Sequence, residues 1–184
     1  MELIFSGFGG QGVLTAGMIV TYAGNETGKK VLWSPSYGSE MRGGTANCNV
    51  TVSDEEIGSP SLSECDVLVA MNEPSLDKFK SVVRKGGYII ANESIIPEDY
   101  QYPEEVNVHK IKATDISVEC NQKRGANLVM LGALCKVTGI FSLECITAHT
   151  DNYFAEKGKS NPFNAACLKA GYEQVKEYVV RAHV

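Results

Sequence analysis

The sequence has no apolar run long enough to cross a bilayer and no block of lysine or arginine that could form a nucleic-acid footprint. A membrane-spanning helix needs about 20 consecutive apolar residues, and nucleic-acid-binding domains usually gather their basic residues on one face. Acidic residues number 22 against 17 basic ones in this 184-residue chain. We therefore expect a soluble protein with no membrane and no nucleic acid among its partners. We expect it in the cytoplasm, because the first residues lack the basic flank of a secretory signal.

The cysteines and histidines lack the spacing of a metal site. None of the six cysteines forms a C-x-x-C pair or a comparable short run, whereas zinc sites and ferredoxin-type clusters draw their ligands from such runs. The three histidines are equally scattered along the chain. We assign no metal ligand and no catalytic residue, and we expect the cysteines to be buried, reduced thiols.

A glycine-rich segment near the start of the chain is the feature around which the rest can be organised. Gly7-Phe8-Gly9-Gly10-Gln11-Gly12 has the spacing G-x-G-x-x-G, follows the apolar run Leu3-Ile4-Phe5 and precedes a helical pattern. In a strand-to-helix turn, glycines of this spacing permit a tight turn and a close approach of a ligand to the backbone. The free N–H groups at the helix start suit a phosphate. The alternative is that the glycines only let the helix pack closely on the strand, without any ligand.

A standard dinucleotide site needs a further residue that this sequence does not have. An Asp or Glu is expected about 20 residues after the glycines, at the end of the second strand, where it holds the ribose hydroxyls. The second strand expected here, Lys30-Val31-Leu32-Trp33, runs into Ser34-Pro35 without an acid. The glycine segment therefore remains a candidate phosphate site, but the standard dinucleotide interpretation loses its main support.

The segment that follows the second strand is a second candidate site. Residues 34–45 have neither a helical nor a strand period, and they contain Tyr37-Gly38 and Arg42-Gly43-Gly44. Long loops inside compact domains are often functional. Because this loop should leave the carboxyl end of its strand, we expect it to lie beside the glycine segment, at the edge where α/β sheets bind ligands and partners.

The rest of the pattern alternates between strands and helices. We predict one α/β domain over residues 1–184, a Rossmann-like three-layer sandwich with helices on both faces of a mostly parallel sheet. The alternating segment 45–52 can run antiparallel, which would make the sheet mixed. Further strands are expected at 66–71, 88–91 and 106–111, and helices at 114–121, at 125–137, from Ser142, from Asn161-Pro162, and from Pro74 to a stop at Lys85-Gly86-Gly87.

Four stretches together resemble the gamma subunit of the 2-oxoacid:ferredoxin oxidoreductases: residues 7–13, 36–46 and 127–132, and Asn161. The resemblance covers nearly the whole chain, and the two glycine motifs are far more specific together than the first alone. In fused relatives such as pyruvate:ferredoxin oxidoreductase, the same domain is one piece of a longer polypeptide. The resemblance implies a complex that oxidatively decarboxylates a 2-oxoacid to its acyl-CoA thioester and reduces ferredoxin.

The resemblance also implies where the cofactors are held. Thiamine diphosphate, magnesium and iron–sulfur clusters are expected in the partner subunits. These partners are the alpha and beta subunits, with a ferredoxin-like delta subunit as a further candidate. Such a location of the cofactors agrees with the absence of a cysteine cluster and of a G-D-G motif followed by an Asn pair. The chain itself is expected to abut the active-site subunits and to help hold coenzyme A. Its candidate contacts are Gly7, Phe8, Gly9, Gly10, Gln11, Gly12, Ser36, Tyr37, Gly38, Glu40, Met41, Arg42, Gly43 and Gly44.

Several alternatives stay open at this point. The loop 36–44 could touch only protein, and Arg42 could pair with a phosphate or with a partner's carboxylate, because its planar fork suits both. Asn127 is either a functional residue of the site or, in the favoured and simpler interpretation, a helix-start cap or a buried amide with its hydrogen bonds satisfied. The competing functions are a self-sufficient NAD- or FAD-dependent oxidoreductase and a small-molecule sensor. The particular 2-oxoacid, or an indolepyruvate-type substrate, is not determined by this chain.

Overall fold

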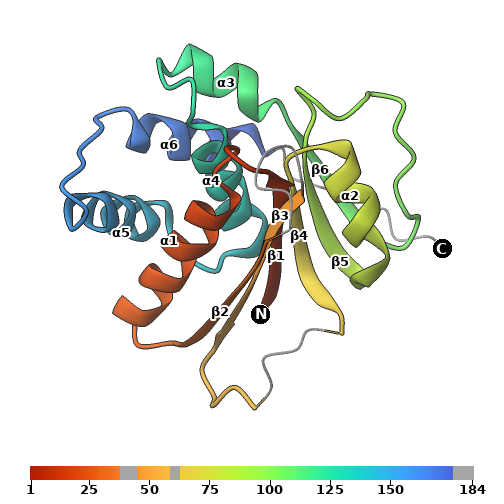
Figure 1. Ribbon diagram of the computed structural model, residues 1–184, viewed down its shortest axis with the longest axis horizontal. Coiled ribbons are helices and arrows are strands. Elements are labelled where there is room, and N and C mark those ends of the chain that lie inside the picture. Colours follow the sequence, from red (N-terminus) through yellow and green to blue (C-terminus); the bar gives the residue numbers. More distant parts are fainter. Residues whose placement is uncertain (38–44, 59–62, 176–184) are drawn as a thin grey trace.

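A six-stranded sheet with helices on both faces forms the fold in a computed structural model, which describes residues 1–37, 45–58 and 63–175. The strand order is β2-β3-β1-β4-β5-β6, so β2 and β6 are the two edges (Figure 1). The predicted α/β sandwich is confirmed. The strands are β1 Glu2–Phe8, β2 Lys30–Tyr37, β3 Thr45–Ser53, β4 Cys65–Ala70, β5 Val83–Asn92 and β6 Asn107–Ile111. The helices are α1 Val13–Glu26, α2 Glu73–Phe79, α3 Ala113–Glu119, α4 Ala126–Thr138, α5 Leu143–Ala155 and α6 Asn164–Gln174, with a short 3₁₀ turn at Lys80–Val82.

The sheet is mixed because one strand runs against the others. β3 lies between β1 and β2 and is antiparallel to both, whereas β1, β4, β5 and β6 are parallel neighbours. The alternation that predicted this strand is visible in its burial, since Cys48, Val50 and Val52 are buried against α1. The predicted antiparallel strand is therefore confirmed.

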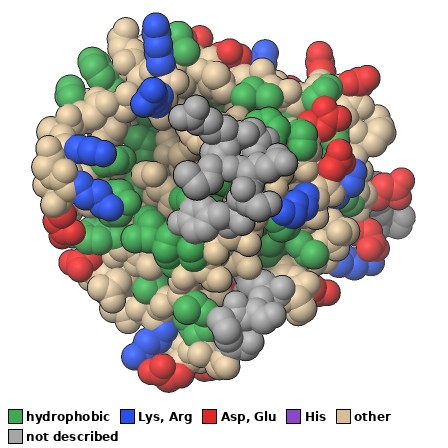
Figure 2. All heavy atoms as spheres, viewed as in Figure 1, with side chains coloured by type: hydrophobic (Ala, Val, Ile, Leu, Met, Phe, Trp, Pro, Cys, Tyr) green, Lys and Arg blue, Asp and Glu red, His purple; other side chains and the backbone are tan. Residues whose placement is uncertain are grey.

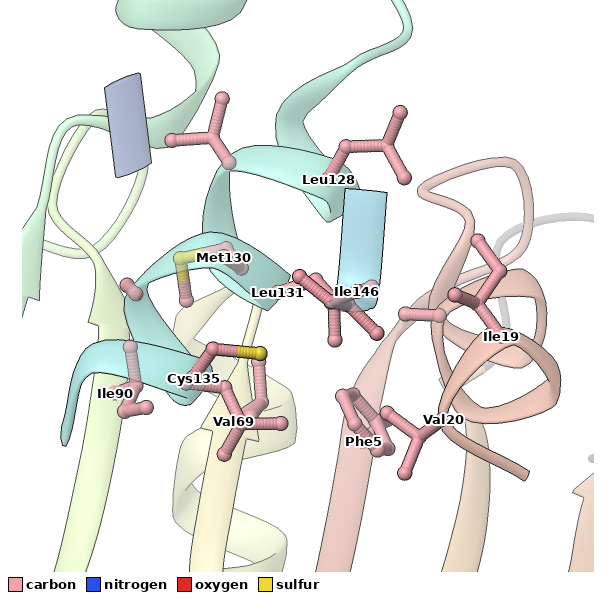
Figure 3. Close-up of a cluster of buried hydrophobic side chains, with 14 of the residues drawn as sticks. Phe5, Ile19, Val20, Val69, Ile90, Leu128, Met130, Leu131, Cys135 and Ile146 are labelled. Atoms are coloured by element: carbon pink, nitrogen blue, oxygen red, sulfur yellow. The ribbon is translucent and has the colours of Figure 1, made fainter. Parts of the chain in front are cut away.

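Two hydrophobic cores lie on the two faces of the sheet. The larger core joins α1, α4, α5 and α6 to one face, and Figure 3 shows its α4 side chains meeting strand residues such as Phe5 and Val69. The smaller core places Leu76 of α2 and Ile96 of the β5–β6 connection on the opposite face. Helices α1 and α2 therefore cover opposite faces of the sheet, as Figure 1 shows.

Helix α4 is the most deeply buried helix that the described ranges contain, and it crosses α6 at very close range. All residues from Asn127 to Cys135 are buried, as a helix that is apolar around most of its circumference requires. A Cβ atom added to Gly132 would collide with the backbone carbonyl of Leu168, and one added to Gly171 with that of Val129. Two glycines, one on each helix, therefore allow backbone to approach backbone at this crossing.

Three boundaries differ from those expected from the sequence. Strand β2 continues through Pro35 to Tyr37, because it pairs with β3 along its whole length. Helix α2 ends at Phe79 and the segment 83–87, expected to finish that helix, starts β5 instead, where Val83 is buried in the smaller core. Helix α6 starts at Asn164 rather than at Asn161, whose side chain accepts the N–H of Phe163 in a turn before the helix.

Other local predictions are confirmed. Ser142 caps α5, with its hydroxyl accepting the backbone N–H of Cys145 at 3.1 Å. The helix expected at residues 114–121 is confirmed as α3, which runs from Ala113 to Glu119. No helix within the described ranges combines the length and the apolar character that crossing a membrane requires.

Candidate functional site

The glycine segment lies at a switch point of the sheet. Strands β1 and β4 are parallel neighbours, and the chain leaves β1 for α1 on one face but leaves β4 for α2 on the other. In open α/β sheets, such a divergence opens a crevice at the carboxyl ends of the two strands, and ligands bind there. The glycine turn and Met71-Asn72 therefore meet at the place where this fold class usually has its site.

The turn between β1 and α1 uses backbone conformations that favour glycine. Gly10 has φ of 95° and Gly12 has φ of 75°, both in the left-handed region. The N–H of Gln11 donates to the carbonyl of Phe8 at 3.1 Å and closes the turn. Gly12 is the N-cap of this 14-residue helix and has no side chain, so it supplies no acceptor to the first N–H groups of α1. The N–H groups at a helix start are the kind of donor that suits an anion or the backbone of another chain.

The glycines of the turn are required for different physical reasons. A Cβ on Gly7 would lie within 2.9 Å of Met71 Cβ and Val13 Cγ1, so Gly7 is needed for close packing. A Cβ on Gly12 would lie 2.6 Å from Nδ2 of Asn127. A Cβ on Gly10 would meet nothing within 4 Å, and Gly10 is exposed. Packing within the chain therefore explains Gly7 and Gly12, while Gly10 leaves open space beside the turn.

A pair of amide side chains fixes the turn from the α2 side. Oε1 of Gln11 accepts the N–H of Phe8 at 2.7 Å and Nδ2 of Asn72 at 2.7 Å. Oδ1 of Asn72 in turn accepts the N–H of Ser75 at 3.0 Å and caps α2. Sequence reasoning placed Gln11 in the site and missed Asn72. The signal for Asn72 was its position directly before Glu73-Pro74, where a helix cap is expected.

A third amide fixes the turn from the side of α4. Asn127 lies in the first turn of α4, is 6% exposed, and donates from Nδ2 to the carbonyl of Gly12 at 3.1 Å. The interpretation of Asn127 as a buried, bonded amide is confirmed, and the alternative of a helix cap is wrong, since Gly125 occupies the cap position. Residue 127 is thereby joined to a turn 115 positions earlier in the chain.

The second candidate loop starts and ends at the same edge of the sheet. Phe8 is paired with Thr45 and Ala46 is paired with Tyr37, so β3 alone separates the end of β1 from the end of β2. Adjacent strands lie about 4.8 Å apart, which places the start of this loop about 10 Å from the glycine turn. Ser36 is exposed. Six predicted site residues lie outside the described residues: Gly38, Glu40, Met41, Arg42, Gly43 and Gly44.

Lys78, which is part of no motif in the sequence, lies at the carboxyl edge of the sheet. Nζ of Lys78 on α2 lies 3.4 Å from Oγ1 of Thr45, the first residue of β3. It brings a positive charge to the carboxyl edge of the sheet, where the N–H groups of the glycine turn also lie. No pattern in the sequence indicates that Lys78 contacts Thr45, because the contact depends on how α2 packs on the sheet.

Two deeply buried thiols, Cys48 and Cys135, are poor nucleophiles and poor metal ligands. Cys48 is buried beneath α1, and burial raises the pKa of its thiol to about 12. Burial raises the pKa of Cys135 to about 12 as well. Both thiols are therefore protonated at neutral pH. Over the parts of the chain that the structure covers, no group of three His, Cys, Asp or Glu side chains could hold a metal ion.

Charges elsewhere on the described surface are mostly paired or dispersed. A hollow of about 430 Å³ lies at the opposite end of the sheet beside Arg84 and Lys85. Arg84 is bonded there to Glu2 and Asp66, and Lys85 to Glu105. On the face drawn in Figure 2, Lys and Arg side chains are scattered rather than gathered in one patch. This distribution does not favour a nucleic-acid partner.

A family model described as pyruvate ferredoxin/flavodoxin oxidoreductase matches residues 2–174. The chain belongs to this family. Within the family, the 2-oxoglutarate synthase subunit KorC of Methanocaldococcus jannaschii is 36% identical over 179 residues, which cover 96% of this chain and 94% of KorC. The crystal structure of a keto/oxoacid ferredoxin oxidoreductase gamma subunit from Geobacter sulfurreducens superposes with a TM-score of 0.76 at 27% identity, covering 94% of this chain and 96% of that one.

Other members of the pyruvate ferredoxin/flavodoxin oxidoreductase family are longer. The ketoisovalerate oxidoreductase subunit VorA of Methanothermobacter marburgensis is 36% identical over 174 residues, and this chain spans only 36% of its length. In VorA a region like this chain is therefore one part of a larger polypeptide.

The sheet order distinguishes this family member from a standard dinucleotide-binding protein. In the standard fold the second strand lies directly beside the first, and its terminal acid reaches the ribose. Here β3 lies between β1 and β2, and the described part of the site has no acid at the end of β2, which runs Lys30–Tyr37. The geometry does not favour a self-sufficient NAD- or FAD-dependent enzyme.

Proposed function

We propose that this chain is the gamma subunit of a cytoplasmic 2-oxoacid:ferredoxin oxidoreductase, and that it contributes to coenzyme A binding and to subunit docking. The observation that carries the proposal is the agreement along nearly the whole chain with KorC and with a crystallised gamma subunit. The complex oxidatively decarboxylates a 2-oxoacid to an acyl-CoA and passes the electrons to ferredoxin. Alpha and beta subunits, with a ferredoxin-like delta subunit as a further candidate, are the partners in this proposal.

The carboxyl edge of the sheet around residues 7–12 and Thr45, the glycine edge, carries groups that support a role in holding coenzyme A. The coenzyme carries phosphate groups, and the edge has the N–H groups at the start of α1, where the N-cap is a glycine, together with the ammonium group of Lys78. The open space beside Gly10 allows a ligand or another backbone to approach the turn. The edge supplies no catalytic acid or base in this proposal, so its role is to bind and to orient.

The other cofactors of the reaction do not fit the described residues. An iron–sulfur cluster needs thiolates at short spacing, and the described cysteines are spread over different elements. Thiamine diphosphate is held through a magnesium ion, which prefers oxygen ligands such as carboxylates. Where the structure covers the chain, it has no group of three carboxylates or other candidate ligands. We therefore assign these cofactors, which supply decarboxylation and electron transfer, to the partner subunits.

The isolated chain is expected to show no 2-oxoacid oxidation. Reconstitution with alpha and beta subunits of the complex is expected to give coenzyme A-dependent reduction of a viologen dye. The reason is that the groups needed for decarboxylation and electron transfer belong to the partners. Turnover by the purified chain alone, or no association with these subunits in size-exclusion chromatography, would contradict the proposal.

Replacing Gly10 by alanine, compared with a control replacement of Gly158, is expected to distinguish an effect on binding from an effect on stability. A side chain in a left-handed conformation costs about 1–2 kcal/mol, so a modest loss of stability is expected from Gly10→Ala and equally from the control Gly158→Ala, whose φ is 67°. Gly158 lies in the connection after α5, and a Cβ there also meets nothing within 4 Å. In the reconstituted complex, Gly10→Ala should raise the Michaelis constant for coenzyme A or the dissociation constant of the subunits about tenfold.

The control should leave both binding constants within twofold of wild type. Equal effects of Gly10→Ala and Gly158→Ala on binding would mean that the glycine edge contacts neither coenzyme A nor a partner.

A further inference from the structure

The hydrogen bonds around Gln11 fix the orientation of both amides in the network. A backbone N–H can only donate, so Gln11 must turn its oxygen to Phe8 and Asn72 must turn its oxygen to Ser75. The NH₂ group of Asn72 then faces Oε1 of Gln11, at 2.7 Å. Asn72 is 1% exposed and its bond to Ser75 is buried, while the two bonds that Oε1 of Gln11 accepts are partly buried. One buried side chain thus bonds the start of α2 and the glycine turn at the same time.

Among the described residues, hydrogen bonds hold the turn at both ends, and the middle of the turn is exposed. Asn72 acts on Phe8 and Gln11 through the Gln11 side chain, and Asn127 holds the carbonyl of Gly12 at 3.1 Å. Gly9 and Gly10 lie between these anchors and are exposed. Glycines lose more backbone freedom on ordering than other residues. Without the anchors, a ligand would have to order the turn when it binds, which weakens binding.

We propose that Asn72 is a positioning residue for the glycine edge. It acts through Gln11 to hold the turn in the conformation that presents the N–H groups at the start of α1. The inference rests on the proposed function, since it takes coenzyme A as the ligand of this edge. It goes further by assigning to a buried residue of the β4–α2 junction an effect on a ligand that it does not touch.

The test compares Asn72→Ser, Gln11→Ala and the double variant. Serine keeps a good N-cap for α2, but its shorter side chain cannot also carry an amide donor to Gln11. In the reconstituted complex, each single variant is expected to raise the Michaelis constant for coenzyme A at least fivefold while kcat stays within twofold. Because Asn72 acts through Gln11, the double variant should be no worse than Gln11→Ala alone.

Hydrogen exchange of the full chain separates the inference from the proposed function. The amides of Phe8 and Gln11 are bonded within the turn, so both are expected to exchange at least tenfold faster in Asn72→Ser. The control Ser142→Ala removes the cap of α5 and should change neither the exchange of these amides nor the Michaelis constant.

Two kinds of contrary result bear on different parts of the inference. Unchanged exchange of Phe8 and Gln11 in Asn72→Ser, or additive effects in the double variant, would overturn the positioning role. Faster exchange with an unchanged Michaelis constant would leave the positioning of the turn intact and would show that the turn does not bind coenzyme A.

Discussion

Gly171→Ala is expected to lower the free energy of unfolding by about 3 kcal/mol, the upper end of the usual range for overpacking. A Cβ at Gly171 would overlap the backbone carbonyl of Val129, and backbone cannot rotate away as a side chain can. Helices α4 and α6 must therefore separate. Because α4 is buried on nearly all sides, its displacement disturbs contacts with the sheet as well as with α6.

The expected loss of stability in Gly171→Ala is opposite in sign to the effect of helix propensity, so the two effects can be told apart. Alanine is a better helix former than glycine by about 1 kcal/mol, so an unhindered Gly→Ala change in a helix would stabilise the chain. At about 2–4 °C per kcal/mol for a domain of this size, the midpoint of thermal unfolding should fall by about 6–12 °C. Chemical and thermal denaturation of the isolated chain measure the effect.

A second helical glycine provides the control. A Cβ on Gly24 of α1 would meet Cγ1 of Val31, a side-chain methyl that can shift. Gly24→Ala should therefore destabilise the chain much less than Gly171→Ala. Equal stability of Gly171→Ala and wild type would show that the close crossing of α4 and α6 does not exist in solution.

Arg42→Ala is expected to weaken either coenzyme A binding or subunit assembly by about 2–5 kcal/mol. Arg42 lies outside the described residues, but its segment leaves β2 at Tyr37 and returns at Thr45, at the same edge as the glycine turn. Its guanidinium group is permanently charged in a chain of net charge −5. Removing it from an anion held away from water leaves that anion unpaired, whereas a pair in open solvent contributes only about 0–1 kcal/mol.

The reconstituted complex tells the two roles of Arg42 apart. A change in the Michaelis constant for coenzyme A alone supports a ligand contact, and a change in subunit affinity alone supports a docking contact. Lys85→Ala is the control, since Lys85 is an exposed cation at the opposite end of the sheet. If Arg42→Ala changes neither quantity by more than about twofold, which is less than 1 kcal/mol, the proposed role of Arg42 is wrong.

Long periodic segments predicted the fold well because their burial follows directly from their pattern. The alternation of Cys48, Val50 and Val52 predicted β3 and its covered face, and the apolar segment 125–137 predicted α4. The prediction failed at residues 83–87, where two glycines after an apolar helix pattern indicated a helix end. Pairing of Val83 with Cys65 of β4 begins a strand there instead, and pairing between distant strands leaves no local signal.

The candidate site was predictable only where the backbone itself made the signal. Gly10 and Gly12 stand out in the sequence because left-handed turns favour glycine, and their role in binding stays a prediction. Asn72, Lys78 and Asn127 reach the site through tertiary packing, from three elements that converge on one edge. Their polar side chains are ordinary in sequence, so only the structure could assign them to the site or, for Asn127, choose between the two interpretations.

The edge strands have a consequence for how this chain can associate with others. Proline is tolerated in a sheet mainly on an edge strand, because it lacks the N–H that an added strand would bond. Pro35 lies in β2, and β6 at the other edge has five residues, among them the exposed Lys110. Neither edge is a good template for continuing the sheet into a neighbouring molecule. We therefore expect little tendency of the folded chain to aggregate by strand addition, and we expect its partners to be bound through loops and helix surfaces.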